Sequence, residues 1–561
     1  MKTLKNAKSV LIAGTVILIG IFIFRLNEQS MPIVLLDEFG YWSNAAFFEG
    51  RDWSSIATHN SYYSYGYSLI LTLLLKMSHG YEVYKLALLF NLIISVLMLL
   101  IHFRIVTMLF PDLDSVIAAI ISVIVQLYPS NASNLHIAWA ELPLAFFFSL
   151  NVLLLLLFYK NKNQIYLYLW IVISFFEYTL HQRALGVLLV AILLSFFMVI
   201  KKEIKCTQLF AVYGLLIALY ALHHYIKALL LNNVVIREQN VMSNVNDYPS
   251  IYQHIINNLN LSGLKSFVIS ASGKAAYLII ISLGTIILLL SKIIRETIQN
   301  KARAAIYVYL IAVSFFELCI ISIFTMGGNR LDNIIYGRYL EWFSQPLILI
   351  GFTCAIHENP QKTLLKGALT VSIACLIVKI IYTITNASDD YIYVCSPAVF
   401  PFYKLVPNKD FILFLGIILS GFLICLTMLQ QKKQLLCLAV VFLFGSIYLD
   451  IVCVNRVLAS NYRSEIIKEI ANEIDNKAYE VYYINDDSQL IWYVADLQVY
   501  KNNLTIKELS ISEKYELPHD CYILLNPYYK EGMNFIKHKH NEEPLISNWQ
   551  VALYKISSTE N

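Results

Sequence analysis

Two adjacent carboxylates, Asp37 and Glu38, open the segment LLDEFGYWSNAAFF just beyond the first apolar run of the chain. The segment has helical spacing, with Tyr41 and Phe48 on one face, and its aromatic residues favour a helix in a membrane interface. The positive end of a helix dipole stabilises an acid in the first turn, which explains one carboxylate but not two. Because neighbours on a helix point about 100° apart, one acid can face a substrate while the other holds a partner or a metal ion.

A third carboxylate, Glu141, opens the apolar stretch ELPLAFFFSLNVLLLLLF. An acid at the edge of a membrane span is a candidate functional residue, and the alternative is a buried hydrogen bond between helices. Tyrosines crowd the segment HNSYYSYGYSLILTLLL, and we take Tyr63 and Tyr65 as candidate substrate contacts. An aromatic belt at the membrane surface is the alternative interpretation of that segment.

Three arginines, Arg183, Arg330 and Arg338, stand where apolar runs meet polar loops. Each alone could be an anchor whose guanidinium reaches the membrane surface. Three of them on one face, beside acids, suggest an anion site of the kind that binds phosphate. Tyr339, which follows Arg338, is a further candidate substrate contact.

The composition indicates a membrane protein. Of the 561 residues 58% are hydrophobic and 14% are charged, which is too apolar for a soluble chain of this length. The net charge of +4 is small, and no nucleic-acid partner is expected. The nine cysteines show no paired spacing, so neither a zinc site nor a disulfide framework is indicated.

Apolar runs of spanning length recur about thirteen times, and the first one is expected to be retained because no small-residue cleavage site follows it. A shorter apolar piece at 67–75 predicts a buried or re-entrant helix. The predicted spans lie near 9–25, 83–103, 114–129, 138–158, 165–181, 184–200, 207–230, 274–291, 304–325, 338–355, 363–384, 410–429 and 435–453.

The charges of the connecting loops predict the orientation of the chain. Short connectors rich in lysine and arginine alternate with longer loops that hold most of the loop acids, as the positive-inside rule requires. We therefore expect a cytoplasmic N-terminus in the plasma membrane, with Asp37, Glu141 and the arginines on the outer face. Lys379 is the one charge inside a late span, and the sequence does not explain it. The acidic motif DLD at 112–114 is interpreted as a helix start.

The last part of the chain has a different composition. Residues 464–476 predict an amphipathic helix with Ile466, Ile467, Ile470 and Ile474 on one face. Short strands are predicted at 480–485, 497–502, 521–526 and 549–556. The domains predicted are a membrane domain, 1–455, whose first outer loop is 26–66, and an extracytoplasmic α/β domain, 456–561.

The acidic pair, the segment YSYGYSLILTLLL, the acid of AELPLAFFF and the segment GRYLEWFSQPLIL together resemble the GT-C superfamily of membrane glycosyltransferases. The resemblance is to the branch that uses polyprenyl-phosphate sugars, which includes protein O-mannosyltransferases and lipid A aminoarabinose transferases. It covers roughly residues 1–360 and extends loosely to an outer C-terminal domain. It implies an all-α polytopic fold with interfacial helices in the first outer loop.

The resemblance also implies roles for individual residues. Asp37 matches the catalytic base, and Glu38 matches the second member of the acidic pair. Glu141 stands where the family often has Asp, and Arg338 matches a basic position near the lipid phosphate. The assignment of Arg183 to phosphate follows from its position and charge alone.

The implied reaction moves a sugar, hexosyl or pentosyl, from a polyprenyl phosphate to an acceptor hydroxyl in one inverting displacement. The acceptor is a cell-envelope glycan, a glycolipid or a protein. A divalent metal ion, if one takes part, would be held by Glu38 or Glu141. The rival functions are a polytopic transporter or flippase of lipid-linked sugars, with charges near mid-membrane, and a polysaccharide polymerase or ligase.

Overall fold

The structure is a computed structural model of the whole chain. It describes residues 2–28, 36–59, 62–235, 255–296, 301–326, 331–357, 360–388, 396–406, 410–449, 461–474, 480–486, 489–509, 511, 520–540 and 543–556.

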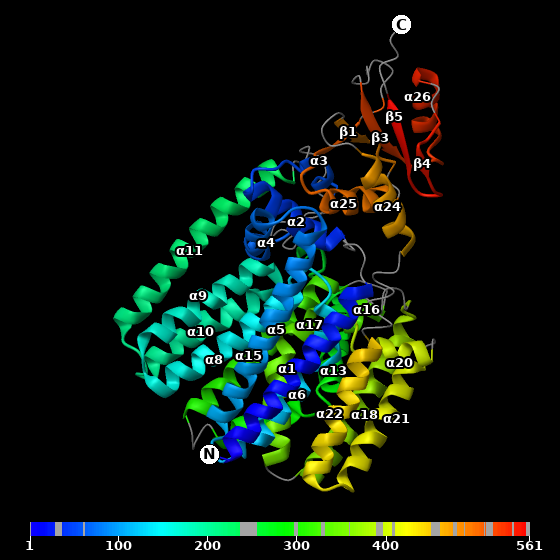
Figure 1. Ribbon diagram of the computed structural model, residues 1–561. Coiled ribbons are helices and arrows are strands. Elements are labelled where there is room, and N and C mark those ends of the chain that lie inside the picture. The colour runs from blue at the N-terminus through cyan, green and yellow to red at the C-terminus, as the bar shows by residue number, and fades with distance from the viewer. Residues whose placement is uncertain are drawn as a thin grey trace.

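The larger part of the chain is a bundle of apolar helices. Its helices are α1 (Lys2–Glu28), α5 (Tyr81–Leu109), α6 (Ser115–Gln126), α7 (Pro129–Asn134), α8 (Glu141–Asn161), α9 (Gln164–Leu180), the short 3-10 helix η1 (Gln182–Ala184), α10 (Leu185–Ile200), α11 (Cys206–Asn233), α13 (Leu261–Ile281), α14 (Ile286–Glu296), α15 (Lys301–Thr325), α16 (Leu331–Ile335), α17 (Gly337–His357), α18 (Pro360–Thr385), α20 (Phe400–Leu405), α21 (Phe411–Thr427) and α22 (Gln431–Leu449). Figure 1 shows α8 to α11 on one side of the bundle and α18 to α22 on the other.

Every predicted span overlaps a helix of this bundle, so the predicted all-α membrane architecture is confirmed. The count of thirteen is not confirmed. Among the residues that the structure describes, nine helices are long and apolar enough to cross a membrane. The helices at the predicted spans 114–129, 165–181, 410–429 and 435–453 are apolar but shorter.

The span predicted at 274–291 is divided between α13 and α14. Leu283 and Gly284, between the two helices, have positive φ angles of 50° and 74°. A Cβ atom at Gly284 would lie 2.8 Å from the Cα of Gly367 in α18. The break therefore lets the backbone of α18 pass close to the chain, a feature that an apolar run cannot reveal.

Two polar features of the bundle have simple explanations. Asp114 accepts a hydrogen bond from the Val116 amide (2.8 Å) at the start of α6, so the interpretation of 112–114 as a helix start is confirmed. Lys379 pairs with Asp410 at 2.6 Å, which accounts for the charge that the sequence left unexplained.

Between the first two long helices the chain folds into α2 (Leu36–Phe48), α3 (Ser54–Ala57) and α4 (Gly66–Met77). In α2, a Cβ atom at Gly40 would overlap the ring of Tyr63, so this glycine allows the tyrosine to lie across the helix. Thr72 of α4 reaches the Ala45 carbonyl of α2 at 3.4 Å. The predicted interfacial helix is thus enclosed by protein over most of its length, with Phe39 through Ala46 buried.

The C-terminal part is a small α/β unit, as predicted. Its sheet has the order β2-β1-β3-β5-β4, with β1 parallel to β2 and β3, and β5 antiparallel to β3 and β4. The boundary predicted at 455/456 lies outside the described residues. The elements are α24 (Asn461–Glu473), β1 (Glu480–Tyr483), α25 (Leu490–Tyr500), β2 (Ile506–Glu508), β3 (Cys521–Leu525), α26 (Lys530–His540), β4 (Ile546–Ser547) and β5 (Ala552–Ile556).

The four isoleucines predicted on one face, at 466, 467, 470 and 474, are all buried. The strand predicted at 497–502 is wrong, because most of that segment belongs to α25. The alternation within LQVY suggests a strand, but Leu490, Val494 and Leu497 recur at helical spacing and are buried. The strand was predicted from residues 497–502 alone, which are too few to show the helical repeat.

This unit rests on the segment between α2 and α4, at the end of the bundle opposite the N-terminus (Figure 1). Arg51 donates to the Asn502 carbonyl at 2.6 Å, and the Ser55 hydroxyl donates to the Ile506 carbonyl at 2.6 Å. His59 Nε2 lies 2.7 Å from Glu508 Oε2. The sheet and the segment that carries Asp37 are therefore held together.

Candidate active site

Asp37 lies in the first turn of α2, where the structure joins it to two partners. Its Oδ1 accepts from the Tyr63 hydroxyl at 2.6 Å, and its Oδ2 lies 2.8 Å from Arg338 Nη1. Burial raises the pKa of this carboxyl, but the charge of Arg338 and the hydrogen bond from Tyr63 outweigh it, so the pKa lies below its usual value of 3.8. The side chain is 37% exposed, so it is both ionised at neutral pH and open to a ligand.

Glu141, in the first turn of α8, is the buried centre of the site, with only 3% of its side chain exposed. Its Oε1 accepts from Arg338 Nε at 2.5 Å and from Arg183 Nη2 at 3.0 Å. Arg338 thus bridges two carboxylates, with Nη1 on Asp37 and Nε on Glu141. Residues from four distant parts of the sequence form one ionic network, whose two acids and two arginines balance in charge.

Aromatic rings hold the arginines from the side. The guanidinium carbon of Arg338 lies 4.2 Å from the centre of the Trp139 ring, and that of Arg183 lies 4.5 Å from the centre of the Tyr339 ring. Cation–π contacts of this kind fix the plane of a guanidinium without using its N–H groups. Trp139 was not among the predicted residues, although its position two residues before Glu141 in AWAEL was the available signal.

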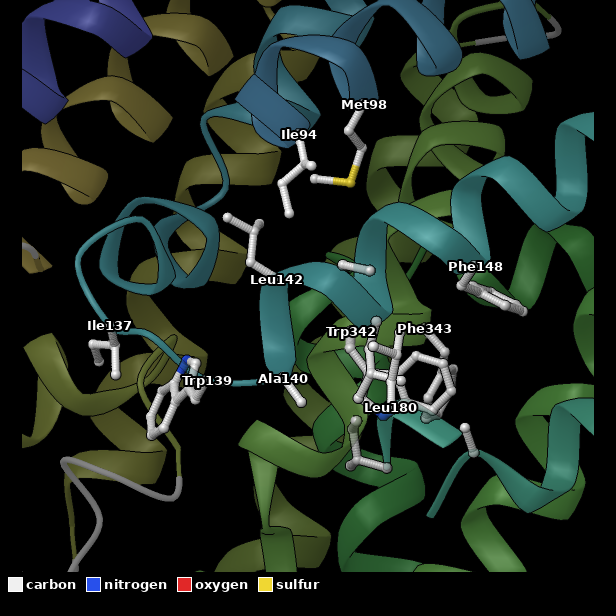
Figure 2. Close-up of a cluster of buried hydrophobic side chains, with 14 of the residues drawn as sticks. Ile94, Met98, Ile137, Trp139, Ala140, Leu142, Phe148, Leu180, Trp342 and Phe343 are labelled. Atoms are coloured by element: carbon white, nitrogen blue, oxygen red, sulfur yellow. The ribbon is translucent and has the colours of Figure 1, made fainter. Parts of the chain in front are cut away.

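The apolar packing behind the network brings α8 and α17 together. Figure 2 shows Trp139 in the loop before α8, Leu142 and Phe148 along that helix, and Trp342 and Phe343 of α17 nearby. The rings of Phe148 and Trp342 meet edge to face at 5.7 Å. This contact fixes the two helix starts that carry Glu141 and Arg338.

Glu38 points away from Asp37 into the protein. It is fully buried, and its Oε1 accepts from the Tyr84 hydroxyl at 2.8 Å and from the Ala138 amide at 2.7 Å. These bonds tie the start of α2 to α5 and to the loop that leads to Glu141. The two adjacent acids therefore have different surroundings, since Asp37 is partly exposed and paired with Arg338 whereas Glu38 is buried in the interior.

A pocket that is partly open to solvent adjoins the network. Its walls are Tyr62, Tyr63, Ser64, His181, Gln182, Arg183, Ile320, Ile321, Phe324 and Tyr339. Within the described part of the chain, Arg183 Nε, Arg183 Nη1 and Gln182 Nε2 are buried donors without an acceptor. Unused donors of this kind are costly unless a ligand supplies the acceptor.

His181 adds a neutral group to this wall. Burial lowers the pKa of its imidazole well below 6.5, and the charges of Arg183 and Arg338 lower it further. Its Nδ1 accepts from the Arg183 amide at 3.2 Å, which agrees with a neutral ring.

The remaining predicted residues are placed differently. Tyr65 is buried away from the network, with its ring 5.5 Å from that of His223. Arg330 lies outside the described residues. The structure thus brings together Asp37, Glu141, Arg183, Arg338, Tyr63 and Tyr339.

The described residues include no group of three or more metal-type ligands. Glu141 Oε1 is engaged by two guanidinium groups and Glu38 Oε1 by a hydroxyl and an amide. The arrangement therefore offers cationic donors at the cavity wall, where an anion fits better than a cation.

Comparison with known proteins supports the fold. No protein-family model and no curated protein matches the sequence. The chain is similar to two crystal structures of ArnT from Cupriavidus metallidurans, a lipid A aminoarabinose transferase. The one bound to undecaprenyl phosphate has a TM-score of 0.52 at 11% identity, and the apo one has 0.56 at 10%. Each comparison covers 98% of both chains. The chain therefore has the GT-C fold of ArnT, as the resemblance in its sequence predicted.

Proposed function

We propose that this protein is a glycosyltransferase that moves a sugar from a polyprenyl phosphate to an acceptor hydroxyl by an inverting displacement. The observation that carries the proposal is the network of Asp37, Arg338, Glu141 and Arg183 beside a cavity with unused cationic donors. The fold shared with an ArnT structure bound to undecaprenyl phosphate supports the lipid carrier.

Asp37 is assigned the role of general base. It is the exposed acid of the network, and its lowered pKa keeps it ionised at neutral pH. A base with a low pKa still accepts a proton efficiently when bonding to the anomeric carbon makes the acceptor hydroxyl more acidic. The hydrogen bonds from Tyr63 and Arg338 fix the direction of its oxygens.

Arg183 and Arg338 are assigned to the donor phosphate. Arg183 lines the pocket, and its buried Nε and Nη1 atoms have no acceptor in the protein. Phosphate oxygens are suitable acceptors for a guanidinium. Charge grows on the leaving phosphate as the bond to the sugar breaks, and fixed cationic donors stabilise that charge. Glu141 acts by holding both arginines, and Glu38 acts by holding the start of α2.

The orientation in the membrane is also part of the proposal. The helix α2, whose first turn carries Asp37, and the sheet lie at the end of the bundle opposite the N-terminus (Figure 1). With basic connectors in the cytoplasm, this end faces outward. The acceptor is then a glycan, a glycolipid or a protein of the cell envelope, and residues 456–561 form an extracytoplasmic domain.

The test is transfer from a polyprenyl-phosphate sugar by the protein reconstituted in lipid nanodiscs, with hexosyl and pentosyl donors compared. Asp37→Asn should lower kcat by about 10²–10⁴-fold, the usual contribution of a general base. Asp52→Asn is the matched control, because Asp52 lies in the same segment and accepts hydrogen bonds from the Ser54 amide and hydroxyl. Full transfer by Asp37→Asn would refute the assignment of the base.

A further inference from the structure

A buried carboxyl group outside the network, Glu317 of α15, reaches the start of α10. Its Oε1 accepts from the Val187 amide at 3.3 Å, and none of the residue is exposed. The first N–H groups of a helix have no acceptor within the helix. The N-cap position of α10 is Ala184, which offers no side-chain acceptor. Glu317 therefore supplies from another helix the cap that α10 lacks.

The neighbouring residue of α10 leaves room for this carboxyl. A Cβ atom at Gly186 would lie 2.6 Å from Glu317 Oε1 and 2.9 Å from its carboxyl carbon. Any larger residue at 186 would displace the side chain or separate the two helices. Gly186 and Glu317 thus form a single fitted contact between α10 and α15.

The turn held by this contact carries the cavity wall. The 3-10 helix η1, Gln182–Ala184, runs directly into α10. Arg183 extends from this turn to Glu141, and His181 and Gln182 line the same cavity. Because Glu317 fixes the backbone only three to four residues beyond Arg183, a shift of the α10 start moves the guanidinium.

A buried carboxylate is costly unless cationic or N–H groups compensate it. A helix N-terminus supplies N–H groups and the positive end of the helix dipole. An apolar residue at 317 would avoid the cost of burial but would remove the acceptor of the Val187 amide. The energetic reason to keep an acid at 317 is therefore the position of α10.

We propose that Glu317 is a positioning residue that holds Arg183 in register with Glu141 and the cavity, without touching the substrate. The proposal rests on the proposed function for the assignment of Arg183 to the donor phosphate. The claim that Glu317 fixes the position of Arg183 does not depend on that assignment.

The experiment compares Glu317→Leu, Glu317→Gln and Gly186→Ala, each alone and combined with Arg183→Lys. Glu317→Leu and Gly186→Ala should each raise KM for the lipid donor about tenfold, less than the roughly 10²-fold that a full 1 Å misplacement can cost. Glu317→Gln keeps a carbonyl acceptor for the Val187 amide and should stay within about twofold of wild type. Gly214→Ala in α11 is the matched control, since a Cβ there meets nothing within 4 Å.

In the Arg183→Lys background, Glu317→Leu should change KM by less than about twofold, since coupled residues are not additive. An equal factor in both backgrounds would overturn the proposal. Thermal unfolding of wild type, Glu317→Leu, Arg183→Lys and the double variant gives a second double-mutant cycle that needs no substrate. If wild type transfers no sugar but the unfolding cycle shows coupling, the proposed function fails and the contact stands. If transfer occurs and neither cycle shows coupling, the positioning role is wrong.

Discussion

Replacing Glu141 by glutamine removes one negative charge from a network in which two acids and two arginines balance. The Oε1 atom of Glu141 accepts from Arg338 at 2.5 Å and from Arg183 at 3.0 Å, and the side chain is 3% exposed. Glutamine has nearly the same shape and keeps a carbonyl acceptor. The substitution therefore changes the charge while leaving the packing close to that of wild type.

The expected magnitude follows from these two contacts. Hydrogen bonds to charged groups contribute about 1.5–3 kcal/mol each, and removal of one partner of a buried ion pair costs about 3–5 kcal/mol. Because the amide still accepts, we expect the lower end, a loss of about 3 kcal/mol in the free energy of unfolding. Transfer should fall by about 10²–10³-fold, as when one preorganised electrostatic contact is lost.

The assay combines thermal unfolding in detergent with sugar transfer in nanodiscs. Glu177→Gln is the matched control, because Glu177 is equally buried but accepts from a neutral group, the Asn151 amide, at 3.0 Å. The Glu177→Gln substitution should leave transfer unchanged, because it takes no charge from the network. A Glu141→Gln protein with the melting temperature and transfer rate of wild type would show that Glu141 does not hold the arginines, and would refute the charge-balance reasoning.

Three further predictions concern Arg338, Tyr63 and Glu508. Arg338→Ala should raise KM for the lipid donor about tenfold or more, since a guanidinium–phosphate contact is lost; an effect on acceptor KM alone would contradict the phosphate assignment. The lowered pKa of Asp37 means that its ionised form stabilises the site above pH 3.8 and that this stabilisation is lost as the pH falls through the lower folded pKa. Tyr63→Phe removes a hydrogen bond that lowers this pKa, so the acid limb of the kcat/KM profile should move to higher pH, and an unmoved limb would exclude Asp37 as its source. Burial raises the pKa of Glu508, but its contact with His59 lowers it overall, so the contribution of Glu508 is present above pH 4.5 and is lost as the pH falls through the lowered value. Glu508→Gln should increase hydrogen exchange in residues 54–59 modestly, since a partly exposed pair contributes about 0.2–1 kcal/mol; unchanged exchange there would show that this pair does not hold the sheet in place.

The sequence was most informative about the site residues that are charged and lie in apolar surroundings. Asp37, Glu141, Arg183 and Arg338 each stand out as charges beside apolar runs, and the structure brings all four together. The angle between neighbours on a helix correctly indicated that Asp37 and Glu38 would have different partners. Which of the two joins the arginine network depends on Tyr63, Tyr84 and the loop before α8, which are far from the pair in sequence.

The sequence was less informative where the outcome depends on close approach between helices. The break at Leu283–Gly284 lies where α18 passes close to the chain, and one glycine in an apolar run does not by itself predict such a break. Tyr65 belongs to the same tyrosine-rich segment as Tyr63 but packs beside His223, since only the fold decides which side each ring takes. Glu317 was missed for a similar reason, because its partner at Val187 is contributed by a separate helix.

The bridging position of Arg338 has a consequence for the catalytic cycle under the proposed reaction. When the acceptor hydroxyl gives its proton to Asp37, the carboxylate that Arg338 Nη1 holds becomes neutral. In the same step the leaving lipid phosphate gains a further negative charge. The arginines therefore lose the Asp37 carboxylate as a partner while a more negative phosphate forms beside them. The total charge of protein and substrates is conserved, and no counter-ion has to be recruited from solution. Asp37 must then return its proton to water before the next cycle, which its lowered pKa favours at neutral pH and which would restore its ion pair with Arg338.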